Sequence, residues 1–151
     1  MKTDKLNTLV NFMDDLPRKS CHMPNWAAED VTPTSCGSHG CACGWAATIF
    51  RKEGWSFDIS CPMGAVPTFG VSSGAAAFAR FFEIPLDSAW SITMPSTSVH
   101  HPSYYDQFKV ITFESVTPQM VATRIRDIIR HNGGEVVEDY PITSHKELQT
   151  K

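Results

Sequence analysis

The sequence lacks any apolar run long enough to cross a membrane. A spanning helix needs roughly 18 or more apolar residues in succession, and glycine, serine or a charged residue interrupts each apolar stretch here. Residues 1–17 also lack the unbroken apolar stretch and small-residue cleavage site of a signal peptide, and they carry Asp4, Asp14 and Asp15. We therefore expect a cytoplasmic protein with no membrane segment.

An excess of positive charge is also missing. The chain has 13 Lys and Arg against 16 Asp and Glu, which gives a formal net charge of −3 at pH 7. Such a chain sets up no field that would draw the whole molecule to nucleic acid or to an anionic membrane. We expect no nucleic-acid partner.

A regular disulfide framework is the third absence. The five cysteines are an odd number, and three of them, Cys36, Cys41 and Cys43, lie within eight positions. Secreted disulfide scaffolds favour even numbers and wider spacing. Reduced thiols or metal ligands are the better interpretations.

What is present indicates one folded domain. At 151 residues and 42% hydrophobic, the chain can bury one real core and is too short to suggest two independent domains. We predict a single globular domain over residues 1–134 and a polar, flexible C-terminal tail over residues 135–151.

The local patterns predict a mainly α fold with minor short β structure (α+β), with about four to five helices. Helical spacing and capping signals predict helices over residues 4–16, 41–53, 74–83 and 86–92, and a last one that begins at Pro118 after the N-cap Thr117. Residues 55–72 and 108–113 predict brief strands. Residues 94–107 predict an irregular surface loop, and all four tryptophans, including Trp90, are expected to lie in the core.

The helix over residues 41–53 is the expected centre of the fold, because small Ala and Cys residues allow close approach of its neighbours. The same segment is a candidate zinc site formed by Cys36, His39, Cys41 and Cys43. The single-residue gap between Cys41 and Cys43 argues against zinc, because it turns the two side chains in different directions. Buried packing thiols are the alternative, and we predict no obligatory cofactor.

Cys41 is also a candidate nucleophile. A thiol at a helix N-terminus is expected to have a lowered pKa. The order Cys41, then His100 or His101, then Asp106 is similar to that of papain-like enzymes. The histidines, however, lie in a Pro-rich segment with little strand-forming sequence beside it, which argues against catalysis.

Two other segments are candidate ligand-binding sites. One combines polar groups and rigid aromatic rings: His100, His101, Tyr104 and Tyr105. The other is the last helix, where Arg124 and Arg130 could hold an anion. The alternatives are a loop that covers the core with its tyrosines and a solvated helix face.

The segment CGSHGCACGWA at residues 36–46 resembles a signature of the type CGTxxCxxGWA found in small proteins of unknown function from tailed bacteriophages and their prophages. The matching positions are Cys36, Gly37, Cys41, Gly44, Trp45 and Ala46. Ser38 replaces the threonine, and His39 and Cys43 depart from the pattern. A fainter likeness extends to Leu16, Pro17, Met23 and Trp26, to the helix near Phe81 and to residues 117–125.

The resemblance implies a phage accessory role in the cytoplasm of an infected bacterium. We expect a non-enzymatic protein that blocks a host defence protein or sequesters a small anionic ligand such as a nucleotide. A homo-oligomer is compatible with the sequence. The alternatives are a cysteine-dependent hydrolase or transferase that uses Cys41, and a zinc-stapled structural or interaction module.

Overall fold

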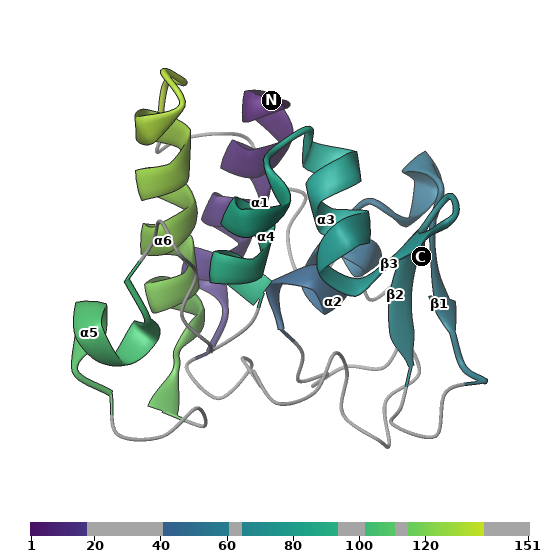
Figure 1. The fold of residues 1–151 in the computed structure, drawn as a ribbon, viewed down its shortest axis with the longest axis horizontal. Helices are drawn as coiled ribbons and strands as arrows, with labels where there is room; N and C mark the ends of the chain where they lie inside the picture. Colours follow the sequence, from purple (N-terminus) through teal and green to yellow (C-terminus); the bar gives the residue numbers. More distant parts are fainter. Residues whose placement is uncertain (18–40, 61–64, 94–101, 111–114, 138–151) are drawn as a thin grey trace.

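The structure, a computed structural model, describes residues 1–17, 41–60, 65–93, 102–110 and 115–137. It confirms the mainly helical α+β class (Figure 1). The described α-helices are α1 (Thr3–Asp15), α2 (Ala42–Ile49), α3 (Gly74–Phe82), α4 (Leu86–Thr93), α5 (Tyr104–Phe108) and α6 (Pro118–His131). A 3-10 turn, η2 (Arg51–Glu53), follows α2, and the strands are β1 (Trp55–Asp58), β2 (Val66–Phe69) and β3 (Ser72–Ser73).

The two ends of the described chain meet, since α1 and α6 lie side by side (Figure 1). At one end of the pair, the side-chain amide of Gln119 donates to the carbonyls of Asp14 and Leu16 at 3.0 and 2.9 Å. These are terminal carbonyls of α1, which the helix itself leaves unpaired. The pair is antiparallel, because the start of α6 lies at the end of α1.

The three short strands form an antiparallel sheet in the order β1-β2-β3. Trp55 is paired with Phe69 in the register between β1 and β2, and their ring centroids are 5.6 Å apart. Phe81 of α3 packs edge-on against both rings. The sheet is therefore joined to the helices by an aromatic cluster.

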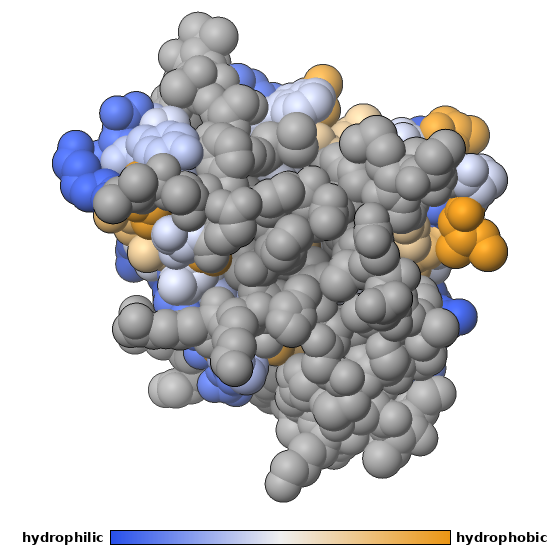
Figure 2. Space-filling model, turned by 90° about the horizontal axis from the view of Figure 1, so that it is seen from below, coloured by the Kyte–Doolittle hydropathy of each residue, from blue (hydrophilic) through white to orange (hydrophobic). Residues whose placement is uncertain are grey.

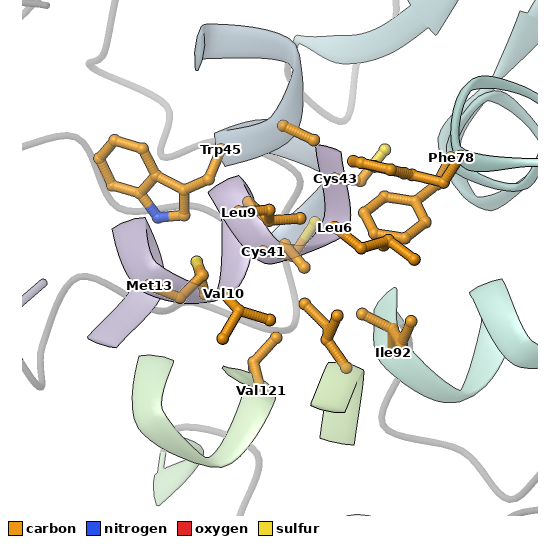
Figure 3. Packing of buried hydrophobic residues seen from close by; sticks show 14 of the residues in the cluster. Leu6, Leu9, Val10, Met13, Cys41, Cys43, Trp45, Phe78, Ile92 and Val121 are labelled. Atoms are coloured by element: carbon orange, nitrogen blue, oxygen red, sulfur yellow. The ribbon is translucent and has the colours of Figure 1, made fainter. Parts of the chain in front are cut away.

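The helix α2 occupies the centre of the molecule, as predicted. It contacts α1, α3, α4 and the strands β1 and β2, and Figure 3 shows Cys43 and Trp45 beside side chains of α1 and α3. Cys41, Ala42, Cys43 and Ala46 are at most 1% exposed, so the small side chains allow the surrounding helices to pack close to the α2 backbone.

Several boundaries differ from prediction. The central helix ends at Ile49 and continues as η2, which terminates at Gly54 in the left-handed conformation with φ of 102°. Residues 104–108 form α5 instead of irregular loop, so the predicted strand cannot begin at Phe108; residues 111–114 lie outside the described part. Trp90 is 42% exposed and is not a core residue, because the buried positions of α4 include Ser88, Ala89 and Ile92.

The segment that follows α6 contacts α1. The chain leaves α6 through Gly133 and Gly134, and two of the next three residues, Glu135 and Val137, hydrogen-bond to α1. The tail predicted for residues 135–151 is described only over residues 135–137, and residues 138–151 lie outside the described part. None of the described helices combines the length and the apolar character needed to span a membrane.

Candidate functional site

A polar cluster in the described interior surrounds Arg124. Although this arginine belongs to the predicted anion site, it is only 3% exposed. Its Nη1 donates to the carbonyl of Ser91 at 2.8 Å. Its Nε and Nη2 both donate to Oε1 of Gln107, at 3.1 and 2.7 Å. Arg124 therefore joins α4, α5 and α6 at one point.

Tyr104 completes this cluster from α5. Its side chain is fully buried, and the centroid of its ring lies 3.9 Å from the guanidinium carbon of Arg124. Its hydroxyl donates to the carbonyl of Ile92 at 3.1 Å. Ser91 and Ile92 lie in the last turn of α4, where backbone carbonyls lack helical partners and carry partial negative charge. Arg124 and Tyr104 together cap that helix end.

The charged guanidinium group of Arg124 is buried from solvent. Burial lowers the pKa of Arg124, and the nearby Tyr104 and Asp127 oppose that shift. An arginine side chain nevertheless remains protonated in proteins, so the cluster holds a positive charge. Asp127 reaches the cluster indirectly, by accepting a hydrogen bond from Nε2 of Gln107 at 3.0 Å.

These contacts correct the anion-binding prediction for the last helix. Arg124 and Tyr104 point inward and bond to groups of the protein itself. Arg130 is exposed and lies 3.5 Å from Asp127, one turn away on α6. Arg126 forms an ion pair with Asp14 of α1. The arginines of α6 thus do not converge on a shared external site.

The prediction that the thiol of Cys41 has a lowered pKa is wrong. Cys41 is the N-cap residue of α2, as the hypothesis required, but its side chain is 1% exposed. Burial raises its pKa from 9.0 to about 11, outweighing hydrogen bonds from backbone groups that lower it. The thiol is therefore protonated at neutral pH and closed to substrates.

Cys43 is a packing group as well. Its thiol donates to the carbonyl of Gly74 at 3.2 Å, and burial raises its pKa further above the usual range. In Figure 3 the Cys43 side chain lies beside Phe78 of α3, whereas Cys41 lies on the side of α1. The two side chains thus face different neighbours, and Cys41 is still close enough to raise the pKa of Cys43 through charge repulsion.

The remaining candidate residues are only partly placed. Cys36, His39, His100 and His101 lie outside the described residues. Asp106 is described, and its carboxylate accepts a hydrogen bond from the Ser103 hydroxyl at 2.7 Å. Within the described ranges, no group of three or more His, Cys, Asp and Glu side chains could hold a metal ion.

Exposed apolar side chains are the remaining candidate for a functional surface. Leu86 and Trp90, four residues apart on α4, are 49% and 42% exposed, and Tyr105 on α5 is 38% exposed. Because residues i and i+4 of a helix are neighbours on its surface, Leu86 and Trp90 form one apolar strip. Figure 2 shows separate hydrophobic groups, but no continuous patch, at the sheet side of the molecule. Ile59 and Val71 are exposed there but lie at opposite ends of the strands.

Sequence reasoning missed the structural roles of Arg124 and Gln107. Position 124 lies between Val121 and Ile128 on the apolar stripe of α6, so periodicity alone would place it inside. The short helix α5 also had a signal, namely Ser103 followed three residues later by Asp106, an arrangement typical of helix N-termini.

Comparison with known proteins gives no further guide to this site, because no family model, curated protein or solved structure matches the chain.

Proposed function

We propose that this protein is a bacteriophage accessory protein that acts in the infected cell by binding a host protein, and that the strip formed by Leu86 and Trp90 on α4 contributes to the contact. The observation that carries the proposal is the exposure of these two large apolar side chains, 49% and 42%, on one helix face. The phage context comes from the resemblance of residues 36–46.

The geometry of α4 and α5 favours a protein partner. Tryptophan is enriched among the residues that dominate binding energy, especially where an aromatic side chain is held by a rigid support. Trp90 directly precedes Ser91, whose carbonyl is bound by the buried Arg124. The same arginine fixes α5, which carries the exposed Tyr105. A partner would therefore meet pre-organised apolar groups.

A small anionic ligand has less support. Binding of a phosphate or nucleotide would call on cationic groups with free donors. Arg124 has donors committed to Gln107 and Ser91, and Arg126 is paired with Asp14. Catalysis by Cys41 has less support too, because its thiol is buried and its pKa is raised.

The proposal is tested by affinity capture from a bacterial lysate with the wild type and the variants Trp90→Ala and Leu86→Ala. Ile59→Ala is the matched control, because Ile59 is 83% exposed and lies away from α4. We expect the wild type and the control to retain the same host protein. A hot-spot truncation costs about 2 kcal/mol, so the Trp90→Ala variant should bind the purified partner roughly 30-fold more weakly.

Two results would contradict the proposal. One is capture of the same proteins in the same amounts by Trp90→Ala and Ile59→Ala. The other is calorimetric binding of a nucleotide that is unaffected by Trp90→Ala, which would favour the anionic ligand instead. Circular dichroism of each variant establishes that the fold is unchanged before binding is compared.

A further inference from the structure

Two buried asparagines on α1 hold the chain that follows α6. Asn7 and Asn11 are 1% and 4% exposed and lie one helical turn apart. The segment they contact is Glu135–Val137, which we call the strap. Buried asparagines are costly unless their amides are hydrogen-bonded, so their placement on the packed face of α1 calls for a specific partner.

The partner is the main chain of the strap. Nδ2 of Asn7 donates to the carbonyl of Glu135 at 2.9 Å, and Oδ1 of Asn7 accepts from the N–H of Val137 at 3.1 Å. Nδ2 of Asn11 donates to the carbonyl of Val137 at 3.3 Å. In a parallel β-ladder, the N–H and C=O of one residue likewise bond to the two residues that flank its partner on the neighbouring strand. Here the Asn7 side chain bonds to Glu135 and Val137, the two residues that flank Val136. The Asn7 amide thus takes the place of a neighbouring strand.

Asn7 and Asn11 bond only to main-chain groups of the strap in these three hydrogen bonds, and the strap side chains contribute little to the contact. Val137 is 37% exposed, Glu135 is exposed, and only Val136 packs in part against the core. Other sequences in an extended conformation could make the same three hydrogen bonds. This is the principle by which exposed strands accept added peptides, with main-chain hydrogen bonds supplying affinity.

The strap is attached through a hinge-like turn. The N–H of Gly134 donates to Ile129 O at 2.8 Å and that of Gly133 to Arg130 O at 3.0 Å, the paired bonds of a Schellman helix end. Gly133 has a φ of 74°, so its position favours glycine. These bonds lie within residues 129–134, so displacement of the strap would break none of them.

We propose that Asn7 and Asn11 form a binding site for an extended peptide, recognised through its main chain, and that the strap occupies this site in cis as a competitor. The site is on α1 and is independent of the α4 strip. Release of the strap would offer two side-chain amides to the C=O and N–H groups of a peptide from another protein.

The test uses the full chain with Val137→Pro, since proline has no N–H to donate to Asn7. The matched control, Val137→Ala, keeps that N–H. A peptide of residues 134–139 is titrated into 15N-labelled protein, and the side-chain amide signals of Asn7 and Asn11 are followed by NMR. One hydrogen bond is worth a factor of about five in affinity. We expect the peptide to bind Val137→Pro at least about fivefold more tightly than it binds Val137→Ala.

Two controls define the site. The same peptide with proline at the position of Val137 should bind the Val137→Pro protein about fivefold more weakly than the unchanged peptide does. Adding Asn7→Leu to the Val137→Pro protein should abolish the peptide-induced shift of the Asn11 side-chain amide signals. If Val137→Pro fails to fold, as judged by circular dichroism, Val136→Asp loosens the strap by removing its apolar contact and leaves both asparagines intact.

Equal affinities for the proline and alanine variants would overturn the proposal, as would binding that persists in the Asn7→Leu variant. A concentration-dependent dimer of the wild type, lost in Val137→Pro, would overturn it in favour of exchange of the strap between two copies of the chain.

Discussion

Replacement of Arg124 by methionine tests whether the buried charge stabilises the fold. The substitution keeps most of the aliphatic length but removes all three hydrogen bonds to Ser91 and Gln107. The Ser91 carbonyl would then be buried without this donor, at a cost of about 1–3 kcal/mol. Loss of the desolvated cation–π contact with Tyr104 adds about 2 kcal/mol.

Removal of a buried charge also relieves a desolvation penalty, which offsets part of these losses. We therefore expect Arg124→Met to lower the free energy of unfolding by about 3 kcal/mol. The assay is urea denaturation followed by circular dichroism, with m-values compared to establish two-state unfolding. Arg130→Met is the matched control, because Arg130 lies on the same helix with its side chain 57% exposed.

The control should change the free energy of unfolding by no more than about 0.5 kcal/mol. If Arg124→Met were as stable as Arg130→Met, the desolvation penalty would cancel the contacts, and the argument that Arg124 secures α4 and α5 to α6 would be refuted. A double-mutant cycle with Gln107→Met should give a coupling of about 1 kcal/mol between the two side chains.

Three other perturbations have defined outcomes. Because folding raises the pKa of Cys41 from 9.0 to about 11, the contribution of its protonated thiol to stability is present below pH 9 and is lost as pH rises toward 11. Between pH 8 and pH 10, the free energy of unfolding of the reduced wild type, measured by urea denaturation, should fall by about 1.3 kcal/mol more than that of Cys41→Ala. Equal losses would contradict burial of the Cys41 thiol. Thr117→Ala should destabilise the protein by about 1 kcal/mol in thermal unfolding, because the Thr117 side chain accepts from the N–H of Met120; no change would mean that the cap is dispensable. Gly133→Asn should lower the melting temperature less than Gly134→Asn does. Asparagine can adopt the positive φ of position 133, whereas a Cβ at Gly134 would lie 2.9 Å from Cγ2 of Ile129. The reverse order of melting temperatures would contradict this explanation.

Local signals predicted the helices well where capping and periodicity agreed. Thr117 and Pro118 begin α6 as expected, and Gly54 ends the segment that contains α2. These features depend on the backbone within a few residues, so a single sequence contains the necessary information. The central position of α2 was also predictable, because few environments suit a run of Ala, Cys and Gly other than close packing.

The candidate site was less predictable because its partners are distant in sequence. Arg124 bonds to Ser91 and Gln107, which lie 33 and 17 residues away. An arginine on an apolar stripe can be a core residue only if acceptors are brought to it, and that depends on tertiary structure. The prediction for Trp90 was wrong in the opposite sense, because an apolar residue expected in the core is exposed. The face of α4 next to the core buries small residues such as Ser88 and Ala89 instead.

The contact between α1 and α6 has a consequence for synthesis on the ribosome. Asp14 and Arg126, which are paired across these helices, are 112 residues apart. The apolar face of α1, including Leu9 and Val10, therefore emerges long before the helix that covers it. The N-terminal segment therefore stays incompletely covered until α6 has been synthesised, and that interval is when chaperones or early aggregation would act on the nascent chain.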